Sequence, residues 1–204
     1  MEFFSSWAGS HESLFWATPL TEDKLTTFYT WKRAGVPLQR CDYIIEGTNY
    51  SFEANQCIMT TDMYRGHHTY GMAFHFGLAQ GFTQDGKSFG LVMQEGIGSK
   101  YTGKDRATED HININGEVFK LDQISMDVQE DQKRSEATGS RQITVNFKTI
   151  ADETAVFPER VCEGTFTSDA LRQEGINLVL LAQKRDYWLG KFDLNCTIDG
   201  QKIN

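Results

Sequence analysis

The stretch HININGEVFK, residues 111–120, decides the fold class of this chain. Ile112 and Ile114 alternate with polar residues, which is the pattern of a strand with one buried face. Asn115-Gly116 follows, and an Asn-Gly pair flanked by apolar residues of this kind is a strong signal for a tight hairpin turn. The stretch therefore predicts two antiparallel strands joined by a two-residue turn.

Similar runs of β-branched and aromatic residues lie on both sides of this hairpin, separated by turn residues such as Asp85-Gly86. No long segment has the periodicity of an amphipathic helix. We predict an all-β antiparallel fold, either a lipocalin-like barrel or a sandwich with few helices, since closing a barrel removes exposed strand edges. Residues 128–141 are mostly polar, so we expect a solvated loop there. The predicted strands cover residues 25–31, 41–47, 50–59, 68–79, 87–95, 111–115, 117–121, 143–148, 162–167, 176–183 and 187–198.

The two ends of the chain differ from its centre. Residues 1–22 mix single aromatic residues with small polar ones, so we expect an irregular N-terminal arm, followed by a β-barrel-like domain over residues 23–204. Residues 197–203 form a turn that opens one more strand, which leaves a C-terminal sheet edge incomplete. Because an open edge presents unpaired backbone groups, we expect that a protein partner could complete it.

The composition limits the partners and the location of the protein. The 204 residues carry a net charge of −8 at pH 7, which opposes binding to the phosphates of nucleic acids. Residues 1–7 lack the basic start and apolar core of a signal peptide, and no apolar run is long enough to cross a membrane. We therefore expect an intracellular protein with no nucleic-acid partner and no membrane span.

The four cysteines are far apart in the sequence and form no Cys-x-x-Cys pair. Such spacing favours buried thiols in a reducing compartment over a disulfide framework or a zinc site. The residues concerned are Cys41, Cys57, Cys162 and Cys196.

The first candidate site is the segment Asp62-Met63-Tyr64-Arg65-Gly66, which we interpret as a turn between two strands. Arg65 could orient a polar group of a ligand, with Asp62 tuning it or acting as a base. The alternative is a structural ion pair that holds the turn, with Gly66 providing a left-handed backbone conformation. Ion pairs of this structural kind are common, so we favour the second interpretation.

The second candidate is the pair Glu109 and Asp110, which face opposite sides if they lie on a strand. An inward Glu109 could approach Arg65, and the resulting charge cluster could transfer protons or only stabilise the interior. His75 and His111 complete the candidate residues, but no zinc-binding motif supports a metal site. We therefore expect neither a metal nor a cofactor.

Two other motifs carry no chemistry in this context. Residues 96–100, Gly-Ile-Gly-Ser-Lys, are not followed by the helix that a phosphate-binding loop requires, so a strand end or bulge is the better interpretation. No nucleophile-elbow sequence is present, although triads assembled from distant residues stay open.

The order of these turns and strands resembles the domain-of-unknown-function family twenty-eight hundred and four, over the chain from about Thr18 to its end. The resemblance implies a β-barrel or paired barrel, distantly similar to carotenoid-hydratase-like, lipocalin-like proteins that bind apolar molecules. The matching residues are Asp62, Arg65, Gly66, Asp85-Gly86, Gly96, Gly98, Thr108-Glu109-Asp110, Asn115-Gly116 and Gly190-Lys191-Phe192.

The chain departs from that family in two ways. Family members are longer at both ends, so we expect this chain to correspond to their central and later part. The strand after residue 66 carries tryptophans in the family, whereas here residues 72–76 read Met-Ala-Phe-His-Phe. If those tryptophans shape a ligand cavity, the cavity of this chain is altered.

Three hypotheses for the function follow. The first is a non-catalytic lipocalin-like module that binds an apolar small molecule or serves as a subunit of a larger assembly. The second is a hydratase or isomerase that acts on a hydrophobic molecule by proton transfer. In both, Asp62, Arg65, His75 and Glu109 form a ligand-binding or structural charge cluster. The third is a structural protein whose aromatic N-terminal arm docks into a partner.

Overall fold

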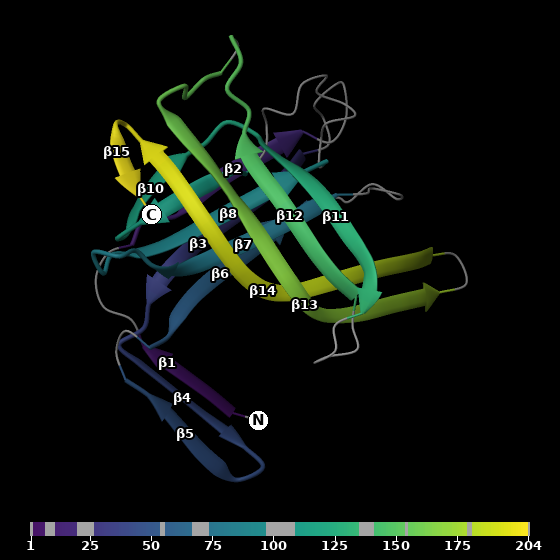
Figure 1. Cartoon of the computed structure of the whole chain (residues 1–204). Helices are drawn as coiled ribbons and strands as arrows, with labels where there is room; N and C mark the ends of the chain where they lie inside the picture. Colours follow the sequence, from purple (N-terminus) through teal and green to yellow (C-terminus); the bar gives the residue numbers. More distant parts are fainter. Residues whose placement is uncertain are drawn as a thin grey trace.

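The structure is a computed structural model, and it describes residues 2–6, 11–19, 27–53, 56–66, 74–96, 109–134, 141–153, 155–178 and 181–203. Every regular element among these residues is a β-strand, and all strand pairs are antiparallel (Figure 1). The all-β prediction is therefore confirmed for the part of the chain that is described. None of these residues belongs to a helix that is long and apolar enough to cross a bilayer.

The N-terminal part of the chain forms two three-stranded sheets. The small sheet contains β1 (Glu2–Ser6), β4 (Arg40–Ile45) and β5 (Thr48–Phe52). The N-terminal sheet contains β2 (Leu14–Pro19), β3 (Thr27–Pro37) and β6 (Ile58–Arg65), in the order β2-β3-β6.

The middle sheet has the order β10-β9-β8-β7. Its strands are β7 (His75–Phe82), β8 (Ser88–Glu95), β9 (His111–Ile114) and β10 (Glu117–Lys120). The hairpin predicted from residues 111–120 is present as β9 and β10. Asn115 and Gly116 both have positive φ angles, 50° and 94°, which a type I′ turn requires.

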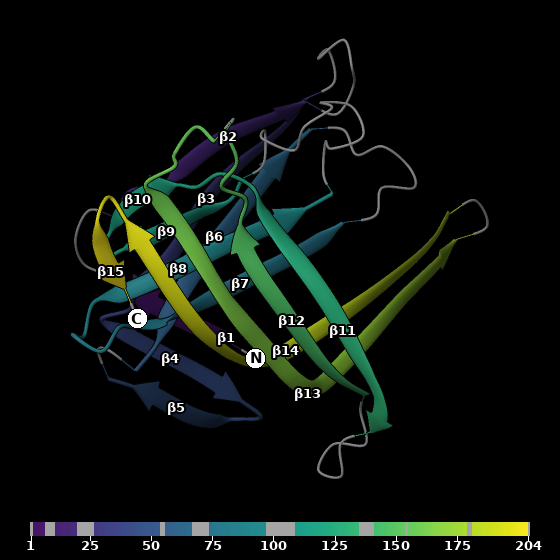
Figure 2. The same cartoon turned by 45° about the horizontal axis from the view of Figure 1, so that its top comes forward.

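The C-terminal sheet is five-stranded, in the order β11-β12-β13-β14-β15. Its strands are β11 (Ile124–Arg134), β12 (Arg141–Thr149), β13 (Arg160–Leu178), β14 (Leu181–Ile198) and β15 (Gln201–Ile203). The predicted final strand after residue 200 is thus present, as the last strand of this sheet. The long hairpin of β13 and β14 extends past the other strands (Figure 2).

Three expectations about local structure were wrong. The N-terminal arm is not irregular, because β1 pairs with β4 and β2 pairs with β3. Of the loop predicted over residues 128–141, residues 128–134 instead continue strand β11 and residue 141 begins β12, with which β11 pairs, whereas residues 135–140 lie outside the described residues. Asp62 and Arg65 lie inside β6 and not in a turn, because β6 pairs with β3 along its length. The pairings of β1 with β4 and of β3 with β6 join segments separated by other strands, which local sequence patterns do not reveal.

The described strands form separate open sheets and do not close into a barrel. The N-terminal, middle and C-terminal sheets stack as layers, and the strands of the C-terminal sheet cross those behind them (Figure 1). The small sheet lies to one side of this stack in both views (Figures 1 and 2). Among the predicted alternatives, stacked sheets therefore describe the arrangement better than a barrel.

Strand β8 is buried on both faces, which makes it the centre of the stack. Phe89, Leu91 and Met93 point toward the C-terminal sheet and join the main hydrophobic core. The alternate residues face the N-terminal sheet. The core also contains Ala79, Ile112, Leu121, Ile124, Phe147, Cys162, Cys196 and Ile198.

Strands β3 and β8 cross at a pair of glycines, Gly35 and Gly90. A Cβ atom added to Gly90 would lie 2.4 Å from the backbone nitrogen of Gly35. A Cβ atom added to Gly35 would lie 2.4 Å from the backbone nitrogen of Gly90. Gly35 also has a φ of 71°, which side chains rarely tolerate. The two backbones therefore touch at this point and set the spacing between the two sheets.

The prediction of four free thiols was also wrong. Cys162 and Cys196 form a disulfide, since they lie directly opposite each other on β13 and β14 with their Cα atoms 4.1 Å apart. Because the two cysteines are 34 positions apart in the sequence, their proximity could not be predicted from local patterns. Cys41 and Cys57 are free. Burial raises the pKa of the Cys57 thiol, and a hydrogen bond with Cys41 raises it further.

The glycine crossing generates a first prediction. Gly90→Ala should lower the free energy of unfolding by about 3 kcal/mol or more, because backbone rather than a movable side chain blocks the new methyl group. Urea denaturation of both proteins measures this loss. The matched control is Gly86→Asn, since nothing lies near a Cβ at Gly86 and Asn tolerates its φ of 81°. Equal stability of the two variants would contradict the close crossing.

Candidate functional site

The candidate site lies between the N-terminal and middle sheets, and Lys32 is at its centre. On β3 the alternate residues Thr30, Lys32 and Ala34 are all buried and face the middle sheet, up to the register shift between Arg33 and Val36. Lys32 Nζ donates to Asp62 Oδ2 at 2.8 Å and lies 2.9 Å from Glu109 Oε1. One buried ammonium group thus joins two carboxylates from different parts of the chain.

The site is open on the side of Asp62. The side chain of Asp62 is 40% exposed, whereas those of Lys32 and Glu109 are 3% and 2% exposed. Lys32 Nζ also lies 4.4 Å from the centre of the Phe76 ring, a cation–π distance. Phe76 and Tyr64 are 44% and 65% exposed. The charged cluster is therefore bordered by aromatic side chains that solvent reaches.

Glu109 carries an unusual buried carboxyl group. Its Oε1 atom is paired with Lys32, but its Oε2 atom is buried and has no hydrogen-bond partner among the described residues. Burial raises the pKa of Glu109, whereas Lys32 and a hydrogen bond from the Thr30 side chain lower it, and Asp62 adds a smaller upward effect. A carboxyl group with such an environment can hold a proton closer to neutral pH than an ordinary glutamate.

His111 follows Glu109 by two residues and is fully buried. Its Nδ1 atom lies 2.7 Å from the backbone oxygen of Glu109, and because a carbonyl only accepts, Nδ1 carries the hydrogen. Burial lowers the pKa of His111 to about 4, so the ring is neutral at pH 7. The Nε2 atom therefore presents a lone pair, and it has no partner within the described part of the chain.

These atoms belong to a larger set of buried polar atoms without partners. Glu109, His111 and Asn113 are spaced by two residues, so their side chains lie in a row along one face of the middle sheet. Buried polar atoms normally have a partner, and an exception calls for water, an ion or a ligand. Within the described residues, this row contains Glu109 Oε2, His111 Nε2 and Asn113 Nδ2.

Two other buried charges next to the site have structural roles. The Asp110 carboxylate accepts hydrogen bonds from the backbone nitrogens of Gln94, at 2.6 Å, and Ile124. Lys120 Nζ donates to the backbone oxygens of Asp110 and Leu121 and lies 4.9 Å from the centre of the Trp16 ring. Burial lowers the pKa of Lys120 to about 8, although nearby carboxylates oppose this. These contacts hold the segment that positions Glu109.

The residues predicted from the sequence are only partly brought together. Asp62 and Glu109 share Lys32 as a common partner. Arg65 is exposed and lies three positions after Asp62 on the same strand, so it points to the opposite face of the N-terminal sheet. His75 lies 3.5 Å from Glu95, also away from the Lys32 cluster, since its neighbour Phe76 faces Lys32. The predicted approach of Glu109 to Arg65 is replaced by its contact with Lys32.

Lys32 itself was missed by sequence reasoning. The predicted strand 25–31 ended one residue before it. The signal was present, because continuing the alternation past residue 31 places a lysine in a row of otherwise small and apolar residues. Residues 97–100 of the glycine-rich stretch lie outside the described residues. Within the described ranges, no three His, Cys, Asp or Glu side chains gather as a metal site would require.

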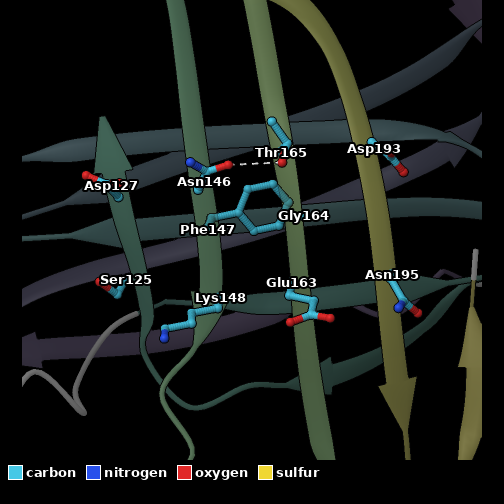
Figure 3. A pocket seen from close by; sticks show the side chains of 10 residues that line it. All are labelled: Ser125, Asp127, Asn146, Phe147, Lys148, Glu163, Gly164, Thr165, Asp193 and Asn195. Carbon is cyan, nitrogen blue, oxygen red and sulfur yellow. Dashed lines mark hydrogen bonds between the residues drawn. The ribbon is translucent and has the colours of Figure 1, made fainter. Parts of the chain in front are cut away.

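A hollow of about 510 Å³ lies over the C-terminal sheet (Figure 3). Thr165 donates to Asn146 there at 3.1 Å. The charged groups around the hollow are exposed, and none of its polar atoms is buried without a partner in the described structure. It is therefore a weaker candidate than the Lys32 cluster. Its lining residues are Ser125, Asp127, Asn146, Phe147, Lys148, Glu163, Gly164, Thr165, Asp193 and Asn195.

The comparison with protein families agrees with the resemblance seen in the sequence. The family Domain of unknown function (DUF2804) matches residues 3–204. The chain belongs to the DUF2804 family. Neither a curated protein nor a solved structure matches it. For this DUF2804 protein the function therefore has to be argued from the site itself.

The burial of His111 predicts a pH dependence of stability. Because the pKa of His111 falls from 6.5 to about 4 on folding, the unfolded chain binds a proton in this range and the native protein does not. Stability should therefore fall as the pH falls from 6.5 to 4, by about 3 kcal/mol from this residue. Urea midpoints of wild type and His111→Gln across this range measure the difference. Parallel pH profiles of the two proteins would contradict a buried neutral histidine.

Proposed function

We propose that this protein binds a small, largely apolar molecule at the Lys32 cluster, with the polar end of the molecule directed toward Glu109 and His111. The observation that carries the proposal is the row of buried polar atoms without partners beside Lys32. A protein interior does not normally leave such atoms unpaired. A bound molecule that supplies the missing hydrogen bonds accounts for them.

The surroundings of the cluster support an apolar ligand body. Phe76 and Tyr64 are large aromatic side chains that stay exposed next to the half-exposed Asp62. Ligand sites commonly combine apolar and aromatic walls with a few convergent polar groups. Exposed aromatic side chains beside a buried polar cluster fit the entrance of such a site.

A second candidate is proton transfer, as in a hydratase or isomerase. The observation in its favour is that Glu109 has a raised pKa while His111, on the same face, is neutral with a free Nε2 atom. An acid and a base held in opposite protonation states are the usual parts of such chemistry. The same perturbed groups also occur in purely structural networks, so this function ranks below binding.

A role as a subunit of a larger assembly is a further part of the proposal. Strand β15 is the last strand in the order of the C-terminal sheet, and it contains only Gln201–Ile203. A partner strand could pair beside it, since edge strands offer unpaired backbone groups.

The binding proposal predicts which variants lose affinity. Phe76→Ala and Tyr64→Ala should each weaken binding of the neutral fluorescent probe N-phenyl-1-naphthylamine about tenfold, which corresponds to about 1.4 kcal/mol of lost contact. Fluorescence titration measures the dissociation constants. Phe15→Ala is the matched control, because Phe15 is an equally exposed aromatic residue on the other face of the N-terminal sheet. Equal losses in all three variants, or no binding by the wild type, would reject the proposal.

The proton-transfer candidate predicts isotope exchange. An apolar molecule co-purified with the protein, recovered after incubation in D₂O, should gain deuterium on carbon, and Glu109→Gln should abolish the gain. Mass spectrometry of the extracted molecule provides the measurement. Exchange at the same rate in Glu109→Gln, or no exchange in the wild type, would leave binding without catalysis as the function.

A further inference from the structure

We infer that the polar group of the ligand is a neutral hydroxyl, so that an apolar alcohol is bound in preference to a fatty acid or a phosphate ester. This inference rests on the proposed binding function and specifies the chemical class of its ligand. It follows from which hydrogen-bonding groups at the site are already occupied and which are not.

The buried cation has no donor left for an anion. A lysine ammonium group has three N–H donors. Lys32 directs two of them at Asp62 and Glu109, and the Phe76 ring lies over the same nitrogen at 4.4 Å. The other buried lysine, Lys120, donates to two backbone oxygens and faces the Trp16 ring. A carboxylate or phosphate would therefore have to displace an existing partner.

His111 Nε2 and Glu109 Oε2 lack partners and require a ligand group that donates a hydrogen bond. His111 Nε2 presents only a lone pair, because the proton of the ring is on Nδ1. Glu109 Oε2 is an acceptor when the carboxyl group is ionised, and a donor only when it carries the proton. A bound carboxylate would place its negative charge beside Glu109 and Asp62, and like charges at short range repel strongly in a buried setting.

The remaining atoms favour a group that donates and accepts at once. Asn113 Nδ2, two positions from His111 on the same face, only donates, since Asn113 Oδ1 already accepts from the backbone of Gly116. A hydroxyl group matches both kinds of partner. An amine would add a second cation beside Lys32, and an ether would leave the His111 lone pair unpaired.

The test is a series of probes with one chain length and different polar ends. 1-Decanol, decanoate and 1-methoxydecane are titrated against the full-length protein at pH 7.5, by displacement of N-phenyl-1-naphthylamine. We expect 1-decanol to bind at least about tenfold more tightly than either of the others. The ether keeps the oxygen but removes the donor, so it tests the contact with His111 separately from charge. The series uses the wild-type protein and does not depend on a variant that folds.

Variants then assign the preference to the site. His111→Phe removes the acceptor and should bring 1-decanol and 1-methoxydecane within about twofold of each other. Arg65→Ala, on the opposite face of the sheet, should keep the full preference. If His111→Phe does not fold, His111→Leu, which also removes the acceptor and is smaller, takes its place and should give the same result.

The outcomes separate the inference from the function on which it rests. Decanoate binding as tightly as 1-decanol, or equal affinity for all three probes, overturns the hydroxyl inference and leaves the proposed binding function standing. Failure of all three probes and of the fluorescent probe overturns the binding function itself, and ordered water is then the partner of the buried atoms.

Discussion

The contact between the backbones of Gly35 and Gly90 sets the separation of the N-terminal and middle sheets, and the candidate site depends on that separation. Only glycine permits this approach, because any Cβ atom would meet backbone on the opposite strand. The crossing brings the inward row of β3 against the segment after β8. Lys32 can therefore reach Glu109, although the two residues are far apart in the chain.

The site formed in this way places charged side chains in the interior of the protein. Lys32 is neutralised by two carboxylates, which is how a buried charge becomes tolerable. Beside it, Glu109 and His111 keep polar atoms that no described residue satisfies. Buried polar groups without partners cost stability, and this cost is the observation from which a bound ligand is proposed at the cluster.

The fold could be predicted in class but not in arrangement. The Asn115-Gly116 hairpin and most strand positions followed from alternation and turn chemistry. The pairing of β1 with β4, the open stacked sheets and the Cys162–Cys196 disulfide did not, because each joins segments far apart in sequence. Local patterns carry information about neighbouring residues, whereas the choice of strand partner depends on burial of the whole chain.

The candidate site, like the fold, could be predicted only in part from the sequence. From the sequence alone, Asp62 and Glu109 were recognisable as acids in a plausible interior, and His111 as sharing a face with Glu109. Only the tertiary structure decided that Lys32, and not Arg65, is their cation. The reason is the period of a strand: Arg65 is three residues from Asp62 and must face the other side, while Lys32 lies opposite Asp62 on the neighbouring strand. Residue spacing determines which side chains share a face, but only packing determines what that face meets.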